Sequence, residues 1–294
     1  MQLTPHQSTI FNQLKQFINS TDEQVFILRG YAGTGKTTLV GFLLHWLSDS
    51  NSKCSPVVLA STGRAARILK QKTKVEARTI HSHIYSFSVI DEQEAKNKDA
   101  WKSNTGQLVL NFDLKISPGT EANNLYIIDE ASMLSYQEQE GDSIARFGSG
   151  NVLSDFLQFA GQSKVIFVGD PAQLPPPVGI NPFSAALAPN YLSKTFNKKV
   201  VVGSLTEILR QKEGAYILQL ATGIRHHIKT RQHDTWEEIM GQSGRGIFHP
   251  FNQQVLFKKI SSLTERGYPK TNHHYSLQQA SILSQSKYPR IAWA

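Results

Sequence analysis

The sequence has little cysteine and no long apolar run, and both absences narrow the classes to which it can belong. Its 294 residues contain one cysteine, Cys54, which excludes an internal disulfide framework and offers no thiolate cluster for a metal. No stretch approaches the roughly 20 apolar residues of a membrane-spanning helix, and residues 1–6 lack the pattern of a secretory signal. We therefore expect a cytoplasmic protein, nucleoid-associated if the source is bacterial, with no membrane partner.

Acidic residues are outnumbered by basic ones. The chain carries 31 lysines and arginines against 23 aspartates and glutamates, which gives a formal net charge of +8 and a pI near 9.4. This balance suits a polyanionic partner. Many basic proteins bind nothing acidic, however, so the charge indicates such a partner only together with a supporting motif. The 39% hydrophobic content is enough for the core of one large domain or two smaller ones.

Short apolar runs recur along the first two thirds of the chain and indicate buried strands. Most lack the alternation of a half-exposed strand, as expected where helices cover both faces of a parallel sheet. Helical periodicity separates several runs, notably over residues 38–47 and 63–71. Near the N-terminus, Thr4 and Gln7 form a capping-box pattern that begins a helix. The sequence therefore predicts an α/β, doubly wound fold, with strands at residues 25–28, 56–59, 125–128, 164–168 and 199–202.

Residues 30–37 read GYAGTGKT and match the pattern G-x-x-x-x-G-K-[ST] at every fixed position. The motif follows an apolar run and opens a helix, which is the context that a phosphate-binding loop requires. Lys36 would reach the β- and γ-phosphates, and Thr37 would ligate Mg²⁺. The alternative is a chance glycine-rich turn, which the flanking strand and helix disfavour. We therefore predict ATP and Mg²⁺ as ligands. The residues assigned to the nucleotide here are Gly33, Thr34, Gly35, Lys36, Thr37 and Thr38.

An acidic pair, Asp129 and Glu130, follows the apolar run at residues 125–128. In a phosphate-loop enzyme, Asp129 would hold Mg²⁺ through water and Glu130 would polarise the attacking water. The pair could also cap the helix that would follow at residues 131–133, and the two roles are compatible. A catalytic role is favoured because the phosphate loop is present.

A polar, proline-rich segment follows the apolar run at residues 164–168. Within it, Gln173 would sense the γ-phosphate if this run lies next to the phosphate loop in the sheet. The alternative is a plain proline-rich loop whose Asp170 and Gln173 form turns. We favour the sensing role.

Six blocks of sequence together resemble the superfamily 1B DNA helicases, the group that includes the RecD, Dda and Pif1-like motors. The resemblance implies a RecA-like P-loop NTPase domain with a parallel sheet and an inserted β-hairpin subdomain. It also implies an ATP-dependent DNA helicase or translocase, with 5′ to 3′ polarity taken from the family alone. Its partners would be single-stranded DNA and single-strand/double-strand junctions. The blocks are residues 30–37, 60–66, 77–81, 129–132, 169–176 and 205–211.

The resemblance adds two residues to the nucleotide site. Gln7 looks like the adenine-reading glutamine of the family, although capping-box duty alone would also explain it. Arg210 looks like the arginine that reaches the γ-phosphate, and a plain helix-end arginine is the alternative. With these, the catalytic set is Lys36, Glu130, Gln173 and Arg210.

Two blocks resemble contacts to single-stranded DNA. Residues 61–64 look like a loop that holds the strand, and Thr79 with His81 looks like a second contact. Hydroxyls and backbone amides suit phosphate binding that ignores sequence. Taken alone, His81 would more naturally be a structural histidine. The predicted DNA-binding residues are Ser61, Thr62, Gly63, Arg64, Thr79 and His81.

The resemblance also divides the chain. Residues 1–84 and 125–211 would form the RecA-like domain 1A, and residues 85–124 a pin-like subdomain 1B whose Trp101 either stacks on a base or packs against the hairpin. Residues 212–294 would be a helical or irregular extension, whose end at 290–294 resembles the first strand of a second RecA-like domain. We expect that domain in cis or from a partner chain, and weak turnover without it. The alternative is a non-catalytic subunit that binds ATP and DNA or serves assembly.

Overall fold

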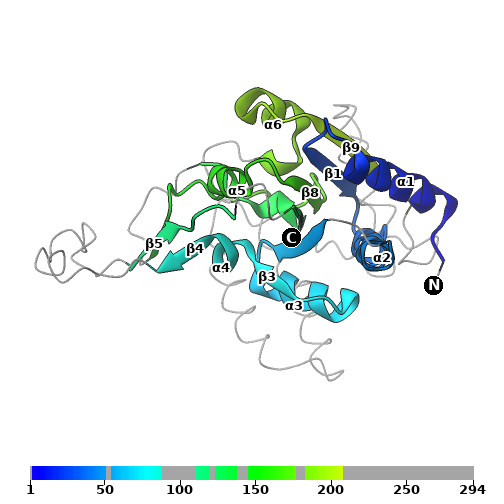
Figure 1. Cartoon of the computed structure of the whole chain (residues 1–294), viewed down its shortest axis with the longest axis horizontal. Helices are drawn as coiled ribbons and strands as arrows, with labels where there is room; N and C mark the ends of the chain where they lie inside the picture. Colours follow the sequence, from blue (N-terminus) through cyan, green and yellow to red (C-terminus); the bar gives the residue numbers. More distant parts are fainter. Residues whose placement is uncertain are drawn as a thin grey trace, which may run out of the picture. The chain divides into compact units, whose positions relative to one another are not determined.

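The computed structural model describes residues 2–50, 54–87, 110–118, 123–137, 145–176 and 183–207 (Figure 1). All of these belong to one compact unit, Met1–Gln211. Three predictions lie outside the described residues: the role of Arg210, the position of Trp101, and the extension at residues 212–294. The subdomain boundaries also stay predictions.

The described unit is built on a sheet of six parallel strands in the order β3-β2-β6-β8-β1-β9. The predicted α/β, RecA-like fold with a parallel sheet is confirmed. The strand that precedes the phosphate loop, β1, lies between β8 and β9, so β8 separates it from β6, which carries the acidic pair. The strands are β1 (Val25–Gly30), β2 (Ser55–Ala60), β3 (Ala77–Thr79), β6 (Asn124–Asp129), β8 (Lys164–Gly169) and β9 (Val200–Leu205).

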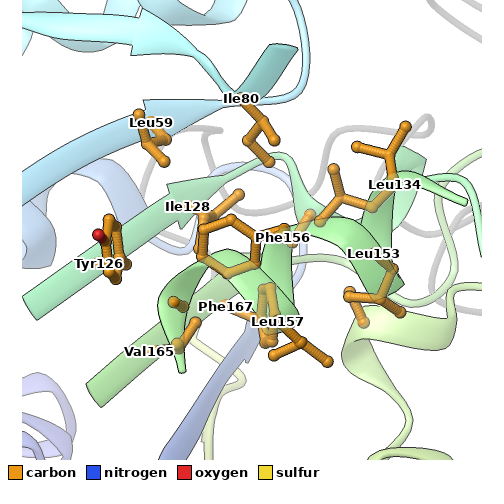
Figure 2. Close-up of a cluster of buried hydrophobic side chains, with 14 of the residues drawn as sticks. Leu59, Ile80, Tyr126, Ile128, Leu134, Leu153, Phe156, Leu157, Val165 and Phe167 are labelled. Atoms are coloured by element: carbon orange, nitrogen blue, oxygen red, sulfur yellow. The ribbon is translucent and has the colours of Figure 1, made fainter. Parts of the chain in front are cut away.

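The central strands bury both of their faces, which explains why their sequences are continuously apolar. On β1, Ile27 belongs to one buried cluster and Phe26 to the cluster on the opposite face. In the first cluster, Phe156 contacts the rings of Tyr126 and Phe167 at centroid distances of 5.5 and 6.1 Å (Figure 2). Two cores therefore clamp the sheet and fix the carboxyl ends of its strands.

Helices cover both faces of this sheet. α1 (Pro5–Asn19), α2 (Lys36–Asp49) and α3 (Gly63–Thr73) contribute to one cluster, and α4 (Ile80–Ile84), α5 (Val152–Ala160) and α6 (Pro189–Phe196) to the other (Figure 1). The predicted helices at residues 38–47 and 63–71 lie within α2 and α3. Short 3-10 turns, η4 (Ala131–Met133) and η5 (Ala185–Leu187), complete the elements of this layer.

The predicted capping box at the start of α1 is present. Thr4 Oγ1 accepts a hydrogen bond from Gln7 N at 3.2 Å, and Gln7 Oε1 accepts one from Thr4 N at 3.1 Å. These reciprocal bonds satisfy two backbone donors that a helix start leaves unpaired.

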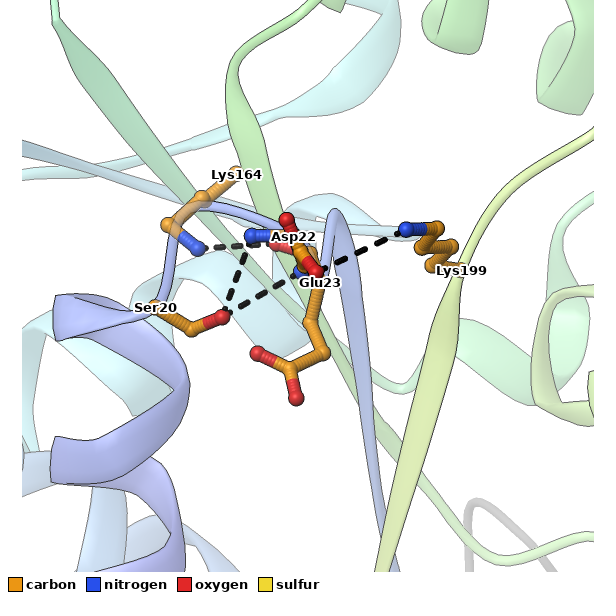
Figure 3. A network of polar contacts seen from close by, with 5 residues as sticks. All are labelled: Ser20, Asp22, Glu23, Lys164 and Lys199. Carbon is orange, nitrogen blue, oxygen red and sulfur yellow. Dashed lines mark hydrogen bonds and ion pairs between the residues drawn. The ribbon is translucent and has the colours of Figure 1, made fainter.

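A polar network fixes the connection from α1 to β1 (Figure 3). Lys164 Nζ, at the start of β8, donates to the carbonyl oxygens of Phe17 and Glu23 at 2.8 Å each. Ser20 Oγ accepts from the backbone N–H of Asp22 at 3.1 Å, and Lys199 lies 3.7 Å from the Asp22 carboxylate. The start of β1 is thereby joined to both of its neighbouring strands.

A second, three-stranded sheet lies beside the main one and contains β4 (Tyr85–Phe87), β5 (Leu110–Leu114) and β7 (Ala145–Phe147). The β4 and β5 strands pair antiparallel, and both fall within residues 85–124, where the inserted β-hairpin was predicted. The parallel partner β7 was not predicted. It is short and comes from sequence after the acidic pair.

One buried carboxylate joins this second sheet to the main core. Asp155, in the first turn of α5 and 3% exposed, accepts hydrogen bonds from the Tyr85 hydroxyl at 2.7 Å and from Ser149 Oγ at 2.6 Å and N at 3.0 Å. The Tyr85 ring also contacts Phe147 of β7 at 5.4 Å. Asp155 and the aromatic rings therefore hold β4 and β7 against α5.

Candidate nucleotide-binding site

The phosphate loop links the end of β1 to the start of α2. Gly33 and Gly35 both have φ of 85°, a left-handed conformation that other residues rarely adopt. At Gly30 the backbone passes so close to Thr34 that an added Cβ would lie 2.6 Å from Thr34 Oγ1. The left-handed backbone therefore favours glycine at positions 33 and 35, and the buried Thr34 side chain leaves no room for a Cβ at position 30.

Lys36 is the first residue of α2 and its side chain lies folded against the loop. Its Nζ donates to the carbonyl oxygens of Gly30 at 2.7 Å and Tyr31 at 3.1 Å, and the residue is only 9% exposed. Its neighbour Thr34 is 1% exposed and donates its hydroxyl to Tyr31 O at 2.9 Å, so the Thr34 side chain braces the loop from within.

The side chain of Thr37, on α2, contacts the side chain of Asp129, at the end of β6. The Thr37 hydroxyl donates to Asp129 Oδ2 at 3.4 Å, although the two residues are 92 positions apart. A hydroxyl and a carboxylate beside a phosphate loop are a donor set that suits Mg²⁺, which prefers oxygen ligands and keeps several waters. Among the described residues there is no cluster of three or more His, Cys, Asp or Glu side chains to offer another metal centre.

Burial raises the pKa of Asp129 above its usual value, while the Glu130 N–H, Lys36 and Thr37 oppose that rise. Burial also raises the pKa of Glu130, and the negative charges of Asp129 and Asp170 add to the effect. Lys36 opposes this rise in pKa as well, so Asp129 and Glu130 lie in a partly desolvated corner beside one buried cation.

The structure tests the alternative in which the acidic pair caps a helix. Glu130 has a left-handed backbone, with φ of 53° and ψ of 40°, and its side chain makes no capping bond to η4. Its N–H instead donates to Asp129 Oδ1 at 2.9 Å. The Glu130 side chain is therefore available to the cavity.

Gln173 follows β8, which pairs with β1, as the predicted sensing role requires. Its backbone N–H donates to Asp170 O at 3.0 Å, and Asp170 Oδ1 accepts from Ala172 N at 3.0 Å. Asp170 thus forms the turn of the alternative interpretation, while Gln173 still lines the cavity.

Gln7 contributes to both the cap and the phosphate loop. It is 4% exposed, and its side-chain amide donates to Thr34 O at 3.3 Å while its oxygen accepts from Thr4 N. Gln7 therefore fastens α1 to the phosphate loop, and its predicted contact with adenine stays a prediction.

A cavity of about 1060 Å³ lies over the phosphate loop and extends between α2 and α3. The lining includes the predicted Gln7, Gly33, Gly35, Thr38 and Gln173, but not Thr34. Sequence reasoning missed the wall supplied by α2 beyond the motif. The helical spacing of Thr38, Gly41, Phe42 and His45 would have revealed it. The predicted site residues that line the cavity are Gln7, Gly33, Gly35, Lys36, Thr37, Thr38, Thr62, Arg64, Asp129, Glu130 and Gln173.

The predicted DNA loop begins at the carboxyl end of β2. The Ser61 N–H donates to Asp129 O at 3.4 Å, and Thr62 caps α3 by accepting from Ala65 N at 3.2 Å. The Ser61 hydroxyl is buried without a hydrogen-bond partner, and Gly63 is exposed. Thr62 and Arg64 line the same cavity as the phosphate loop, whereas Ser61 and Gly63 do not.

The second predicted DNA contact has a clear structural role. Thr79 caps α4, accepting from Ser82 N at 3.2 Å. The His81 ring packs against Phe147 at 5.0 Å and Tyr85 at 5.8 Å, and burial lowers its pKa below the usual value. These contacts match the structural alternative for His81, and neither residue lines the nucleotide cavity. DNA contact by Thr79 and His81 stays a prediction.

The chain is also similar in sequence to known proteins. Residues 2–239 match the family described as AAA domain. An uncharacterized protein of Acanthamoeba polyphaga mimivirus is 27% identical over 183 residues, covering 56% of this chain and 32% of that protein. An uncharacterized protein of Methanocaldococcus jannaschii is 28% identical over 184 residues, covering 62% of this chain and 14% of that protein.

Two solved structures of Pif1 proteins match this chain over most of its length. Bacteroides sp Pif1 in complex with ADP-AlF4 gives a TM-score of 0.46 at 20% identity, covering 88% of this chain and 56% of that one. The Pif1 helicase from Candida albicans gives 0.41 at 18% identity, covering 92% and 56%. The chain thus spans about half the length of these structures and a third or less of the curated relatives.

The parallel sheet, the phosphate loop and the acidic pair define a P-loop NTPase domain with a RecA-like fold. The family match covers more than half of the chain, and the chain belongs to the AAA domain family. Among the described residues, no helix combines the length and apolarity needed to span a membrane.

Proposed function

We propose that this chain is the N-terminal motor half of an ATP-dependent DNA helicase or translocase, with 5′ to 3′ polarity. The observation that carries the proposal is the meeting of Thr37 and Asp129 at 3.4 Å, with Lys36 and Glu130 beside them. It supports a Mg-ATP site in which a hydrolytic carboxylate faces the phosphates. ATP is the substrate and Mg²⁺ the metal.

Each side chain then has a defined task. Lys36 exchanges the carbonyl oxygens of Gly30 and Tyr31 for the β- and γ-phosphates, which are stronger partners because they are charged. Thr37 and Asp129 would hold Mg²⁺, which neutralises phosphate charge when bound. Glu130 orients the attacking water and accepts its proton, a role that suits a carboxylate of raised pKa.

The DNA side of the proposal concerns residues 61–64, Thr79 and His81. Ala60 pairs with both Asp129 and Thr79 across the sheet, and Ser61 N donates to Asp129 O. A shift of the Asp129 strand end on phosphate release would therefore move the proposed DNA loop. The hydrogen bond from Ser61 N to Asp129 O would thus couple ATP hydrolysis to the binding of single-stranded DNA.

Stepping along DNA needs a second RecA-like domain, in cis or from a partner chain. The described residues form one wall of the nucleotide cavity, and we propose that Arg210 and the second domain complete the site. Residues 1–294 alone would then bind Mg-ATP but turn it over slowly.

Strand displacement by a form that includes the second domain, on duplexes with 5′ or 3′ tails, tests the proposal. We expect unwinding from the 5′ tail only, and its loss in Lys36→Ala. Unwinding from the 3′ tail only would reject the polarity. DNA affinity insensitive to Lys36→Ala, without DNA-stimulated hydrolysis, would instead support the non-catalytic subunit.

A further inference from the structure

The described residues carry a second basic surface on α3 and the neighbouring edge strand β3, whose outward-facing part shares only Arg64 with the nucleotide cavity (Figure 1). Residues 64–78 contain six lysines and arginines and one acid, Glu76, so this segment alone supplies +5 of the net charge of +8. α1 and α2 carry two lysines between them, Lys15 and Lys36, and Lys36 is buried. The largest group of cations among the described residues therefore lies at one margin of the sheet.

The cations of α3 lie on two sides of the helix. Leu69 is completely buried, which fixes the inner face, while Arg64 and Lys72 line the nucleotide cavity. Positions 64, 67, 71 and 74 recur every three or four residues and share the outward face. This face, which we call the outer stripe, consists of Arg64, Arg67, Lys70, Gln71 and Lys74.

The outer stripe is exposed and little neutralised. Lys70 pairs with Glu76 at 2.6 Å, but both side chains remain more than half exposed, which makes the pair weak in water. Arg67, Lys74 and the adjoining Arg78 are exposed and make no ion pair with any described residue. Arg67 and Lys74 thus form no ion pair with a described acid, and Arg78 interacts with Glu76 only through its charge.

We infer that the outer stripe binds the phosphate backbone of double-stranded DNA. The stripe runs about 15 Å along the helix at 1.5 Å per residue, and a duplex carries about one charge per 1.7 Å, so several phosphates come within reach together. Residues 63–78 contain no aromatic side chain on which the bases of a single strand could stack. Long, flexible cations without stacking partners suit a duplex and give no sequence preference.

The inference rests on the proposed function only in taking DNA as the partner, because it concerns a different surface. Arg64 lies at the junction between the outer stripe and the proposed single-strand loop. A duplex held on α3 would therefore lie next to the strand that leaves it.

The test compares two double variants of the full chain. Arg67→Gln with Lys74→Gln removes two charges from the stripe, and Lys194→Gln with Lys199→Gln removes two exposed charges at the opposite side of the sheet, on α6 and before β9. Binding of a blunt 20-base-pair duplex and of a 20-base oligothymidylate is followed by fluorescence anisotropy between 50 and 200 mM salt. Thermal unfolding and Mg-ATP binding confirm that each variant is folded.

We expect the stripe variant to bind the duplex on the order of tenfold more weakly, with a salt slope smaller by about 0.9 per lost contact, or about 1.8 in all. Oligothymidylate binding and the control variant should be nearly unchanged. Equal duplex binding by wild type and stripe variant would overturn the inference and leave an acidic protein as partner. A loss confined to oligothymidylate, or an equal loss in the control, would overturn it too.

The helicase proposal is tested separately, by measuring DNA-stimulated ATP hydrolysis and its loss in Lys36→Ala. If a form that includes the second domain shows no DNA-stimulated hydrolysis while its duplex binding still depends on the stripe, the helicase is refuted and this inference is kept. The opposite pattern would keep the helicase and refute the stripe.

Discussion

The two sheets of the described unit are stabilised in different ways. Strands β1, β6 and β8 of the main sheet have six residues each, and nearly all of these are buried between two layers of helices. Strands β4 and β7 of the second sheet have three residues each, and Phe87 on β4 is 47% exposed. The main sheet is held by apolar burial on both faces, and the second by ring contacts and the carboxylate of Asp155.

The difference matters because the two sheets serve different parts of the proposed motor. The carboxyl edge of the main sheet holds Lys36, Thr37 and Asp129, whose geometry must be rigid for phosphate chemistry. The second sheet supports His81 through Tyr85 and Phe147, and shallow packing leaves it easier to deform. Substitutions in the two regions should separate these properties.

The largest effect is expected in the core of the main sheet. Phe156→Ala removes a ring that is fully buried between Tyr126 and Phe167, and should lower the free energy of unfolding by about 3–5 kcal/mol. The matched variant Phe87→Ala, on the exposed side of the second sheet, should cost less than about 1 kcal/mol because much of its ring is already solvated. Urea unfolding curves measure both values. Equal costs would contradict the contrast between the sheets.

A smaller loss of stability is expected when the carboxylate of Asp155, which joins the second sheet to the main core, is removed. Asp155→Ala leaves the buried Tyr85 hydroxyl and the Ser149 groups without their acceptor, and should cost about 2–3 kcal/mol. Asp155→Asn keeps the shape and one acceptor oxygen, so it should recover part of that loss. Proteolysis of the folded state should show faster cleavage in the second sheet, with Mg-ATP binding retained. An unchanged cleavage pattern would mean that Asp155 does not hold this sheet.

Removing the capping box should lower the free energy of unfolding by a smaller amount. Thr4→Ala removes the side-chain acceptor for Gln7 N and should cost about 1 kcal/mol. Thr9→Ala, one turn later and exposed, is the matched control and should change stability by less than about 0.5 kcal/mol. Thermal unfolding of the two variants gives the comparison, and an equal shift in both would argue against the cap.

The smallest expected effect is on pH dependence. Burial lowers the pKa of His81 and His83, so both rings stay neutral in the folded chain at pH values where the unfolded chain protonates them. Stability contributed by the neutral rings is present above their unfolded pKa of about 6.5 and is lost as pH falls toward the folded pKa. Replacing His81 by Gln should reduce the loss of stability between pH 7.5 and 5.5. A loss as steep as that of wild type would show that His81 does not contribute.

The same contrast explains what could be predicted from the sequence. Continuous apolar runs located all the strands of the main sheet except β3, which has only three residues, and the glycine-rich motif located the phosphate loop. The strand β7 and the bond from Tyr85 to Asp155 join residues far apart in the chain, and no local pattern marks them. The bond from the Gln7 amide to Thr34 O was likewise visible only once α1 was in place beside the phosphate loop. The turn at Asp170, in contrast, matches the alternative that the sequence offered.

Titration calorimetry of ATP tests the central claim most directly, because the site built by Lys36, Thr37 and Asp129 should bind the nucleotide before any question of DNA arises. In the presence of Mg²⁺ we expect one saturable site, unchanged in Lys194→Ala, an exposed lysine on α6. Lys36→Ala should weaken binding by about 10- to 100-fold, because hydrogen bonds to charged groups contribute about 1.5–3 kcal/mol. Chelation of Mg²⁺ should weaken binding in wild type. Equal affinity in wild type and Lys36→Ala, with or without the metal, would contradict the account.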